Sequence, residues 1–231
     1  MTEQPKLSVI IPCYNERTTI ESVVKAVREV GLAHEIVIVD DGSSDGTRDI
    51  LSTIASDALV RVIYHDHNQG KGAAVRTGFE AASGDILLIQ DADLEYDPRE
   101  YPTLLKPIIE GKTKVVYGSR FLGAPHKTMF FWNMIANRSL TLITNVLYNS
   151  ILSDMETGYK VFKAEVVHGM KLRSRRFEFE PEITAKVLKR GHRIYEVPIS
   201  YNGREWNEGK KIKWTDAPIA AWTLLRYRFS D

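Results

Sequence analysis

The first half of the chain alternates short apolar runs with longer segments in which apolar residues recur at helical spacing. The apolar runs predict strands at Leu7–Ile11, Glu35–Val39, Val60–Tyr64, Ile86–Gln90 and Val115–Tyr117. The periodic segments between them predict helices at Thr18–Val30, Asp45–Ala55, Gly70–Ala82 and Arg99–Glu110. Strands and helices in alternation are typical of βαβ units, so we expect an α/β fold with a mainly parallel sheet.

The second half of the chain is less regular. Its patterns predict helices at Phe130–Tyr148, Glu180–Arg190 and Ala217–Arg228, and strands at Tyr159–Phe162 and Ile194–Pro198. The polar segment Gly203–Lys213 predicts a loop. Because no repeat, low-complexity segment or long linker interrupts the chain, we expect one domain over residues 1–231.

Polar clusters follow the first four predicted strands, at Pro12–Glu16, Asp40–Gly46, His65–Gly70 and Asp91–Asp93. Ligands of parallel α/β sheets bind beyond the carboxyl ends of the strands, so this shared edge predicts a binding site. Arg120 follows the fifth strand and is expected at the same edge, where its guanidinium would hold a phosphate group in bidentate fashion. A surface ion pair is the alternative for this arginine.

The acidic residues after the fourth strand predict a metal site. Along extended backbone, side chains two apart point the same way, so Asp91, Asp93 and Glu95 are expected to converge. Carboxylates held together repel each other unless a cation lies between them. Oxygen ligands favour Mg²⁺ or Mn²⁺, which would be presented here to a phosphorylated substrate. The alternative is a solvated acidic turn.

Other motifs narrow the chemistry. The segment Gln69–Ala74 lacks the Walker pattern, and no Gly-x-Gly-x-x-Gly follows the first strand, which argues against a dinucleotide-binding domain. This segment instead predicts a helix start that packs closely on the sheet. Asp40 and Asp41 would accept hydrogen bonds from a base or a ribose. The six histidines are scattered and lack the spacing of a zinc site, so we expect solvated or structural roles for them.

The formal net charge of +1 hides an asymmetry between the two parts of the chain. Residues 1–159 hold 15 basic and 21 acidic residues, whereas residues 160–231 hold 16 basic and 9 acidic residues. The basic part would suit a phosphorylated ligand or an anionic membrane surface, and a chance distribution over solvated faces is the alternative. Nucleic acid is not an expected partner.

The lone Cys13 and the absence of a visible signal peptide or spanning segment predict a cytoplasmic protein. The aromatic helix start Met129–Trp132 would contact the membrane peripherally. Core packing or a dimer face is the alternative for these aromatic side chains. The oligomeric state is not predicted.

Several ordered motifs resemble those of the family 2 glycosyltransferases with the GT-A fold. The first set comprises Ser8–Glu16, Val39–Thr47, Asn68–Gly72 and Gln90–Glu95. Further matches lie at Gly118–Phe121, Ser153–Lys160 and Glu196–Ile199. The resemblance covers about residues 6–213. Within the family, the chain is most similar to dolichyl-phosphate mannosyltransferases and related polyprenyl-phosphate glycosyltransferases.

The resemblance implies roles for the matched residues. Those that would bind the nucleotide sugar are Pro12, Tyr14, Glu16, Asp41, Asp91, Ala92, Arg204 and Lys210. Those implied in catalysis are Asp93, as the chief metal ligand, Arg120 and Arg138, as phosphate-binding groups, and Asp154. Glu95 falls where relatives carry Gln or Ser, so its part as a ligand varies within the family. Glu156 interrupts the usual Asp-x-Thr-Gly pattern, which leaves the roles of Asp154 and Glu156 open.

The implied activity is inverting, metal-dependent transfer of one sugar, mannose or glucose, from a GDP- or UDP-linked donor to a polyprenyl or dolichyl phosphate. Residues 1–118 would bind the nucleotide sugar and residues 119–231 the acceptor. A lipid monophosphate has a second pKa of about 6, so it needs no general base. A hydroxyl acceptor would need one, and Asp154 or Glu156 is the candidate. The alternatives are a soluble glycosyltransferase acting on a saccharide or protein hydroxyl, and a non-catalytic nucleotide-sugar-binding subunit.

Overall fold

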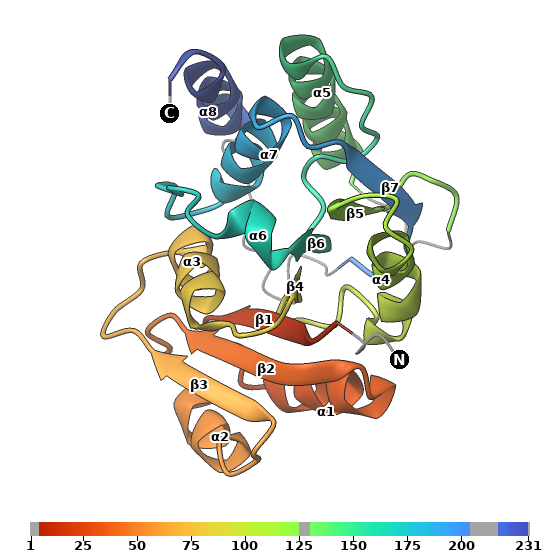
Figure 1. Ribbon diagram of the computed structural model, residues 1–231. Helices are drawn as coiled ribbons and strands as arrows, with labels where there is room; N and C mark the ends of the chain where they lie inside the picture. Colours follow the sequence, from red (N-terminus) through yellow and green to blue (C-terminus); the bar gives the residue numbers. More distant parts are fainter. Residues whose placement is uncertain (1–4, 125–129, 204–216, 231) are drawn as a thin grey trace.

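The computed structural model describes residues 5–124, 130–203 and 217–230, and these contain a seven-stranded sheet covered by helices on both faces (Figure 1). The strands are β1 (Leu7–Cys13), β2 (Ala33–Asp40), β3 (Val60–Tyr64), β4 (Ile86–Ile89), β5 (Val115–Ser119), β6 (Lys160–Lys163) and β7 (Ile194–Pro198). Every residue of β1, β4 and β5 is buried. Strands covered on both faces are expected to be continuous apolar runs, which is why the sequence pattern located them.

The sheet order is β3-β2-β1-β4-β6-β5-β7. Strands β1 to β4 pair in parallel, as do β5 and β7, whereas β6 runs antiparallel between β4 and β5. The prediction of a mainly parallel sheet is therefore confirmed, and the antiparallel strand β6 makes the sheet a mixed one. Because β6 is reversed, its first residue, Lys160, pairs with Ile89 and Tyr117 near the carboxyl ends of β4 and β5. The segment that precedes β6 thus reaches the edge where the parallel strands end.

The helices are α1 (Ile20–Val30), α2 (Thr47–Ile54), α3 (Lys71–Ala81), α4 (Tyr101–Ile109), α5 (Phe131–Tyr148), α6 (Ala164–Val167), α7 (Phe179–Lys189) and α8 (Ala217–Phe229). A short 3-10 turn, η1 (Pro98–Glu100), precedes α4. All predicted helices occur, and the single turn of α6 is an addition. The predicted loop Gly203–Lys213 lies outside the described residues beyond Gly203.

Two apolar layers hold the helices on the two faces of the sheet. Val9 and Ile11 of β1 belong to one layer, which includes residues of α1 and α4, whereas Ile10 belongs to the other. This division follows from the alternation of side chains along a strand. Helix α3 lies very close to the second face, because a β-carbon at Gly78 would lie 2.4 Å from Cγ2 of Ile10. The predicted close packing of this helix on the sheet is confirmed.

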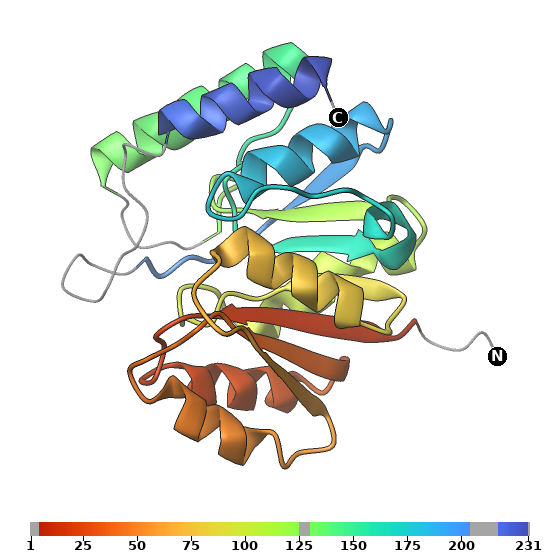
Figure 2. The ribbon, with the colours of Figure 1, turned by 90° about the vertical axis from the view of Figure 1, so that its left-hand side faces the viewer.

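A third apolar cluster joins α5, α7 and α8. Helices α5 and α8 lie side by side on the outer side of α7 (Figure 2). Their contact is fixed by apolar residues such as Leu140 and Leu224, and by the Tyr148 hydroxyl, which donates a hydrogen bond to the Leu224 carbonyl at 2.7 Å. This helical layer stands next to the end of the sheet that β5 and β7 form.

Candidate functional site

A cavity of about 360 Å³ lies at the predicted edge, where β1, β2 and β4 end. This volume is within the range of small-molecule sites. The nucleotide-sugar-binding residues predicted from the sequence that lie in the described part of the chain all line it, namely Pro12, Tyr14, Glu16, Asp41, Asp91 and Ala92. Asp93, Glu95 and Arg120 line it as well. The structure therefore brings these residues together, whereas Arg204 and Lys210 lie outside the described residues.

Asp41 organises the wall of the cavity next to β2. Its carboxylate accepts hydrogen bonds from the backbone N–H groups of Gln69 (2.9 Å) and Gly70 (2.7 Å). Nδ1 of His65 lies 2.7 Å from the same carboxylate, and Nε2 of His65 lies 3.0 Å from the Thr77 hydroxyl. These contacts fix the loop that leads into α3. The structural role expected for His65 is confirmed.

The acidic segment after β4 does not have the geometry expected from extended backbone. Strand β4 ends at Ile89, and the following residues bend, so the alternation rule does not apply to them. Asp91 pairs with Lys71, Asp93 accepts a hydrogen bond from the Glu95 backbone N–H (3.2 Å), and Glu95 accepts one from the Tyr201 hydroxyl (3.1 Å). Within the described ranges, no group of three or more His, Cys, Asp or Glu side chains is arranged to hold a metal ion. The predicted three-carboxylate cluster is corrected accordingly.

Lys71 was not among the predicted site residues, although it lies in the cavity. Its Nζ lies 2.7 Å from Oδ1 of Asp91 and 3.2 Å from Oε1 of Glu180, and Glu180 also pairs with the fully buried Lys160. Burial lowers the pKa of Lys71, but Asp91 and Glu180 raise that pKa by more, so the ammonium stays charged. A cation in the first turn of a helix is disfavoured by the helix dipole. A lysine at this unfavourable position, at the edge of the sheet where ligands bind, was the feature of the sequence that could have indicated Lys71 as a site residue.

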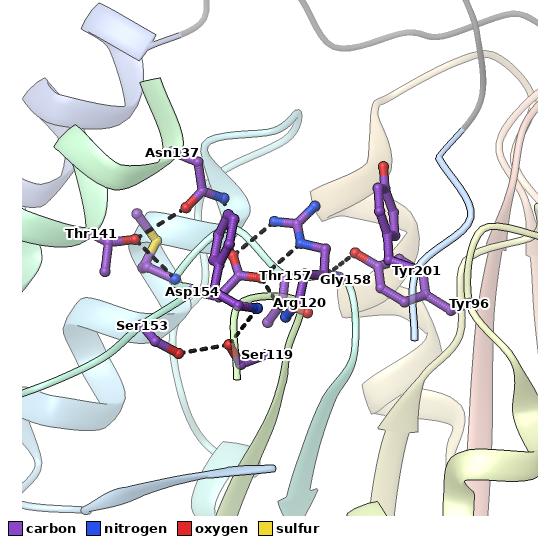
Figure 3. Close-up of polar contacts among 12 residues, drawn as sticks. Tyr96, Ser119, Arg120, Asn137, Thr141, Ser153, Asp154, Thr157, Gly158 and Tyr201 are labelled. Carbon is purple, nitrogen blue, oxygen red and sulfur yellow. Dashed lines mark hydrogen bonds and ion pairs between the residues drawn. The ribbon is translucent and has the colours of Figure 1, made fainter. Parts of the chain in front are cut away.

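Arg120 is held in place by Asp154 (Figure 3). Nε and Nη2 of Arg120 lie 2.7 and 2.8 Å from the two carboxylate oxygens, and the Arg120 backbone N–H donates to the same carboxylate at 3.1 Å. Asn137 of α5 donates a further hydrogen bond at 3.0 Å, and the Arg120 guanidinium lies 5.1 Å from the centre of the Tyr201 ring. The pair orients the arginine along the cavity wall.

Asp154 itself is 0% exposed. Burial raises the pKa of its carboxyl, but the Arg120 guanidinium and the hydrogen bonds lower that pKa by more, so Asp154 stays ionised. Both of its oxygens accept hydrogen bonds from the protein. This arrangement suits a carboxylate that positions Arg120 and does not suit one that takes a proton from a substrate.

A second layer of hydrogen bonds fixes the segment around Asp154. The Ser119 and Ser153 hydroxyls lie 2.6 Å apart, and Glu196 of β7 accepts from the backbone N–H groups of Ser153 and Asp154. The Thr141 hydroxyl of α5 accepts a hydrogen bond from the Met155 backbone N–H at 3.2 Å. The segment is thereby tied to β5, β7 and α5, which restricts the movement of Asp154.

Arg138 lies apart from these residues. It is exposed on α5, and its guanidinium lies 5.3 Å from the centre of the Phe121 ring, one residue after Arg120. It is not among the residues that line the cavity. Its predicted role with an acceptor phosphate stays a prediction.

Residues 8–170 match the family model described as glycosyl transferase family 2. The chain is 32% identical over 210 residues to a dolichol-phosphate mannosyltransferase of Pyrococcus furiosus, an alignment that covers 89% of this chain and 59% of that protein. It is 28% identical over 217 residues to an undecaprenyl-phosphate mannosyltransferase of Micrococcus luteus, with 89% and 87% covered. The chain thus spans about three-fifths of the length of the Pyrococcus relative.

Solved structures identify the fold. Glucosyl-3-phosphoglycerate synthase from Mycobacterium tuberculosis in complex with UDP superposes with a TM-score of 0.77 at 21% identity, over 98% of this chain and 81% of that one. Its complex with Mn²⁺, UDP and glucosyl-3-phosphoglycerate gives a TM-score of 0.76 at 20% identity, with 98% and 81% covered. These likenesses confirm the predicted GT-A fold. The family model, which matches more than half of the chain, establishes that the chain belongs to glycosyltransferase family 2.

Proposed function

We propose that this chain transfers a sugar from a GDP- or UDP-linked donor to a polyprenyl phosphate. The observation that carries the proposal is a cavity lined both by the acidic turn after β4 and by cations, among them Lys71, which pairs with Asp91, and Arg120. Negative charge grows on a departing diphosphate, and an enzyme needs positive groups to stabilise it. A protein that only binds the nucleotide sugar has no leaving group to stabilise. The names of the relatives from Pyrococcus furiosus and Micrococcus luteus support a polyprenyl-phosphate acceptor and mannose as the sugar, with glucose as the alternative.

The residues of the cavity fit a bound Mg²⁺ or Mn²⁺ when part of its coordination comes from the substrate. Mg²⁺ in proteins is usually held by one or two carboxylates and completed by water and substrate phosphates. Asp93 and Asp91 would supply the carboxylates, and Glu95 stands further along the same wall. When bound, the ion would stabilise the negative charge that grows on the leaving diphosphate. The solved neighbour that holds Mn²⁺ together with UDP supports this assignment.

The residues of the chain divide the remaining work. Pro12, Tyr14, Glu16 and Asp41 hold the nucleoside end of the donor, and Lys71 and Arg120 stabilise its phosphates. Direct attack by the acceptor oxygen opposite the leaving group inverts the anomeric centre. Because a lipid monophosphate is largely ionised at neutral pH, no general base is needed. This agrees with the full engagement of Asp154 by Arg120.

The acceptor phosphate meets Arg120 and Arg138. Arg204 and Lys210, which lie outside the described residues, stay predicted nucleotide-sugar-binding residues. Bulky aromatic side chains remain exposed on α5 and α8, among them Trp132 (72%) and Trp222 (67%). An exposed aromatic surface beside basic residues suits peripheral contact with the membrane that carries a lipid acceptor. In the parts of the chain that are described, no helix has both the length and the apolar character needed to cross a bilayer.

The test is a transfer assay with purified protein, Mn²⁺ or Mg²⁺, and a panel of GDP- and UDP-sugars, with and without polyprenyl phosphate. Lipid-linked product is expected, and Asp93→Ala should abolish it. Asp49→Ala, on the exposed side of α2, is the matched control and should keep full activity. Product formed only on saccharide or protein hydroxyls would favour the soluble glycosyltransferase. Binding of nucleotide sugar without transfer to any acceptor would favour the non-catalytic subunit.

A further inference from the structure

Glu156 is a residue of the cavity that the proposed reaction leaves without a role. It lines the cavity together with Asp91, Arg120 and Gly158. Its Oε1 atom is buried and has no hydrogen-bond partner among the described residues. A buried polar atom without a partner costs free energy, so a ligand that donates a hydrogen bond to it would be favoured.

The order of the strands places Glu156 relative to a bound donor. Pro12 and Asp41 line the cavity beyond β1 and β2, Asp91 and Asp93 beyond β4, and Arg120 beyond β5. Because the reversed β6 begins between β4 and β5, Glu156 lies at the end of the cavity away from β2. A donor with its nucleoside over β1 and β2 and its diphosphate at β4 therefore directs its sugar toward Glu156. This placement rests on the function proposed above.

The charges around Glu156 indicate which kind of ligand group would bind to it. Glu180 and Asp154 are its negative neighbours, and Lys160 and Arg120 its positive ones, so the local charges largely cancel. Burial and then Glu180 raise the pKa of Glu156 to about 7. The carboxyl can accept hydrogen bonds from hydroxyl groups in either protonation state, and a sugar presents neighbouring hydroxyls in a fixed geometry.

We propose that Glu156 binds hydroxyl groups of the sugar being transferred and thereby selects among donor sugars. Its carboxyl matches one arrangement of hydroxyls and leaves an epimer with an unpaired group. A site built around such a hydrogen bond discriminates more strongly than an apolar pocket. Glu156 is thus a specificity-determining residue, distinct from the groups that hold the diphosphate.

The test compares wild type with Glu156→Gln, which keeps the size of the side chain. kcat/KM is measured for a series of epimeric sugars on one nucleotide, together with the inhibition constant of the free nucleoside diphosphate. We expect the ratio between preferred and rejected sugars to fall about tenfold or more, because the amide replaces an acceptor by a donor. The inhibition constant of the nucleoside diphosphate should stay within about twofold. A uniform loss for all sugars, or unchanged kinetics, would overturn the inference.

Glu100→Gln is the matched control. Glu100 also has a buried oxygen without a hydrogen-bond partner among the described residues, and burial also raises the pKa of its carboxyl, but it lies outside the cavity. In Glu100→Gln, the ratio of kcat/KM between preferred and rejected sugars should equal that of wild type. If Glu156→Gln does not fold, Glu156→Asp keeps the charge, withdraws it by one methylene, and should shift the same ratio.

The two proposals fail separately. Absence of transfer by the wild-type chain to every acceptor contradicts the proposed function. The inference is then decided by calorimetry. The affinity for a nucleotide sugar is compared with the affinity for the nucleoside diphosphate, in wild type and in Glu156→Gln. A sugar contribution to affinity that Glu156→Gln leaves intact, or the absence of one in wild type, would overturn the inference.

Discussion

Asp154→Asn separates a positioning role from a catalytic one. The substitution keeps the shape of the side chain and removes the negative charge that faces Arg120. The carboxylate is 0% exposed and the Arg120 side chain only 11% exposed, so water can replace little of the lost interaction. The side-chain contacts at 2.7 and 2.8 Å join the two groups, and one amide oxygen can keep only part of them.

The magnitude follows from the charge that is left behind. Removing one partner of a buried ion pair costs about 3–5 kcal/mol, because the other charge stays buried without compensation. The remaining amide oxygen and the Tyr201 ring offset part of this cost. We therefore expect the free energy of unfolding to fall by about 3 kcal/mol. Because Arg120 loses its orientation, KM for the phosphorylated substrates should rise as well.

The assay is urea denaturation, in which the midpoint should shift while the slope stays unchanged. Arg120→Met supplies the control: in that background, Asp154→Asn should cost much less, since the pair is already broken. Suppose instead that activity disappears while the free energy of unfolding stays within about 0.5 kcal/mol of wild type. Asp154 would then act directly on the substrate, and the positioning role would be refuted.

Three further predictions concern the cavity. Lys71→Met should lower kcat/KM about 100-fold in steady-state assays, because a cation near the diphosphate is lost, whereas Lys25→Met on the exposed face of α1 should have no effect. In Gly158→Ala the new β-carbon would lie 2.4 Å from Oδ2 of Asp91, so we expect about 1–3 kcal/mol of destabilisation in thermal unfolding and weaker Mn²⁺ binding. An unchanged melting temperature would contradict this contact. The raised pKa of Glu156, about 7 against 4.5, means that the folded protein binds more protons than the unfolded chain between these values. The unfolding free energy of wild type relative to Glu156→Gln should therefore fall as pH rises from about 4.5 to 7, by about 3 kcal/mol in all, and parallel pH profiles would refute the burial of this carboxyl.

The sequence by itself determined the elements of the fold and the edge that holds the cavity. Strands buried on both faces are mostly apolar, which is why β1, β4 and β5 were found within two residues of their observed bounds. Parallel strands bring their carboxyl ends to one edge, so the polar clusters after them had to meet there. The ordered motifs sufficed for the family, and several of them follow parallel strands directly at this edge.

Only the tertiary structure decided which side chains pair within the cavity. Asp154 follows Arg120 by 34 residues, and they meet because β6 inserts in reverse between β4 and β5, so that the segment before it ends at the same edge. Lys71 pairs with Asp91 and Glu180 for a related reason, since α3 begins and α7 lies beside it at that edge. The bend after Ile89 likewise sends Asp91, Asp93 and Glu95 to separate partners. Contacts between distant segments and the burial that they cause depend on strand order and direction, which local patterns of apolar and polar residues do not encode.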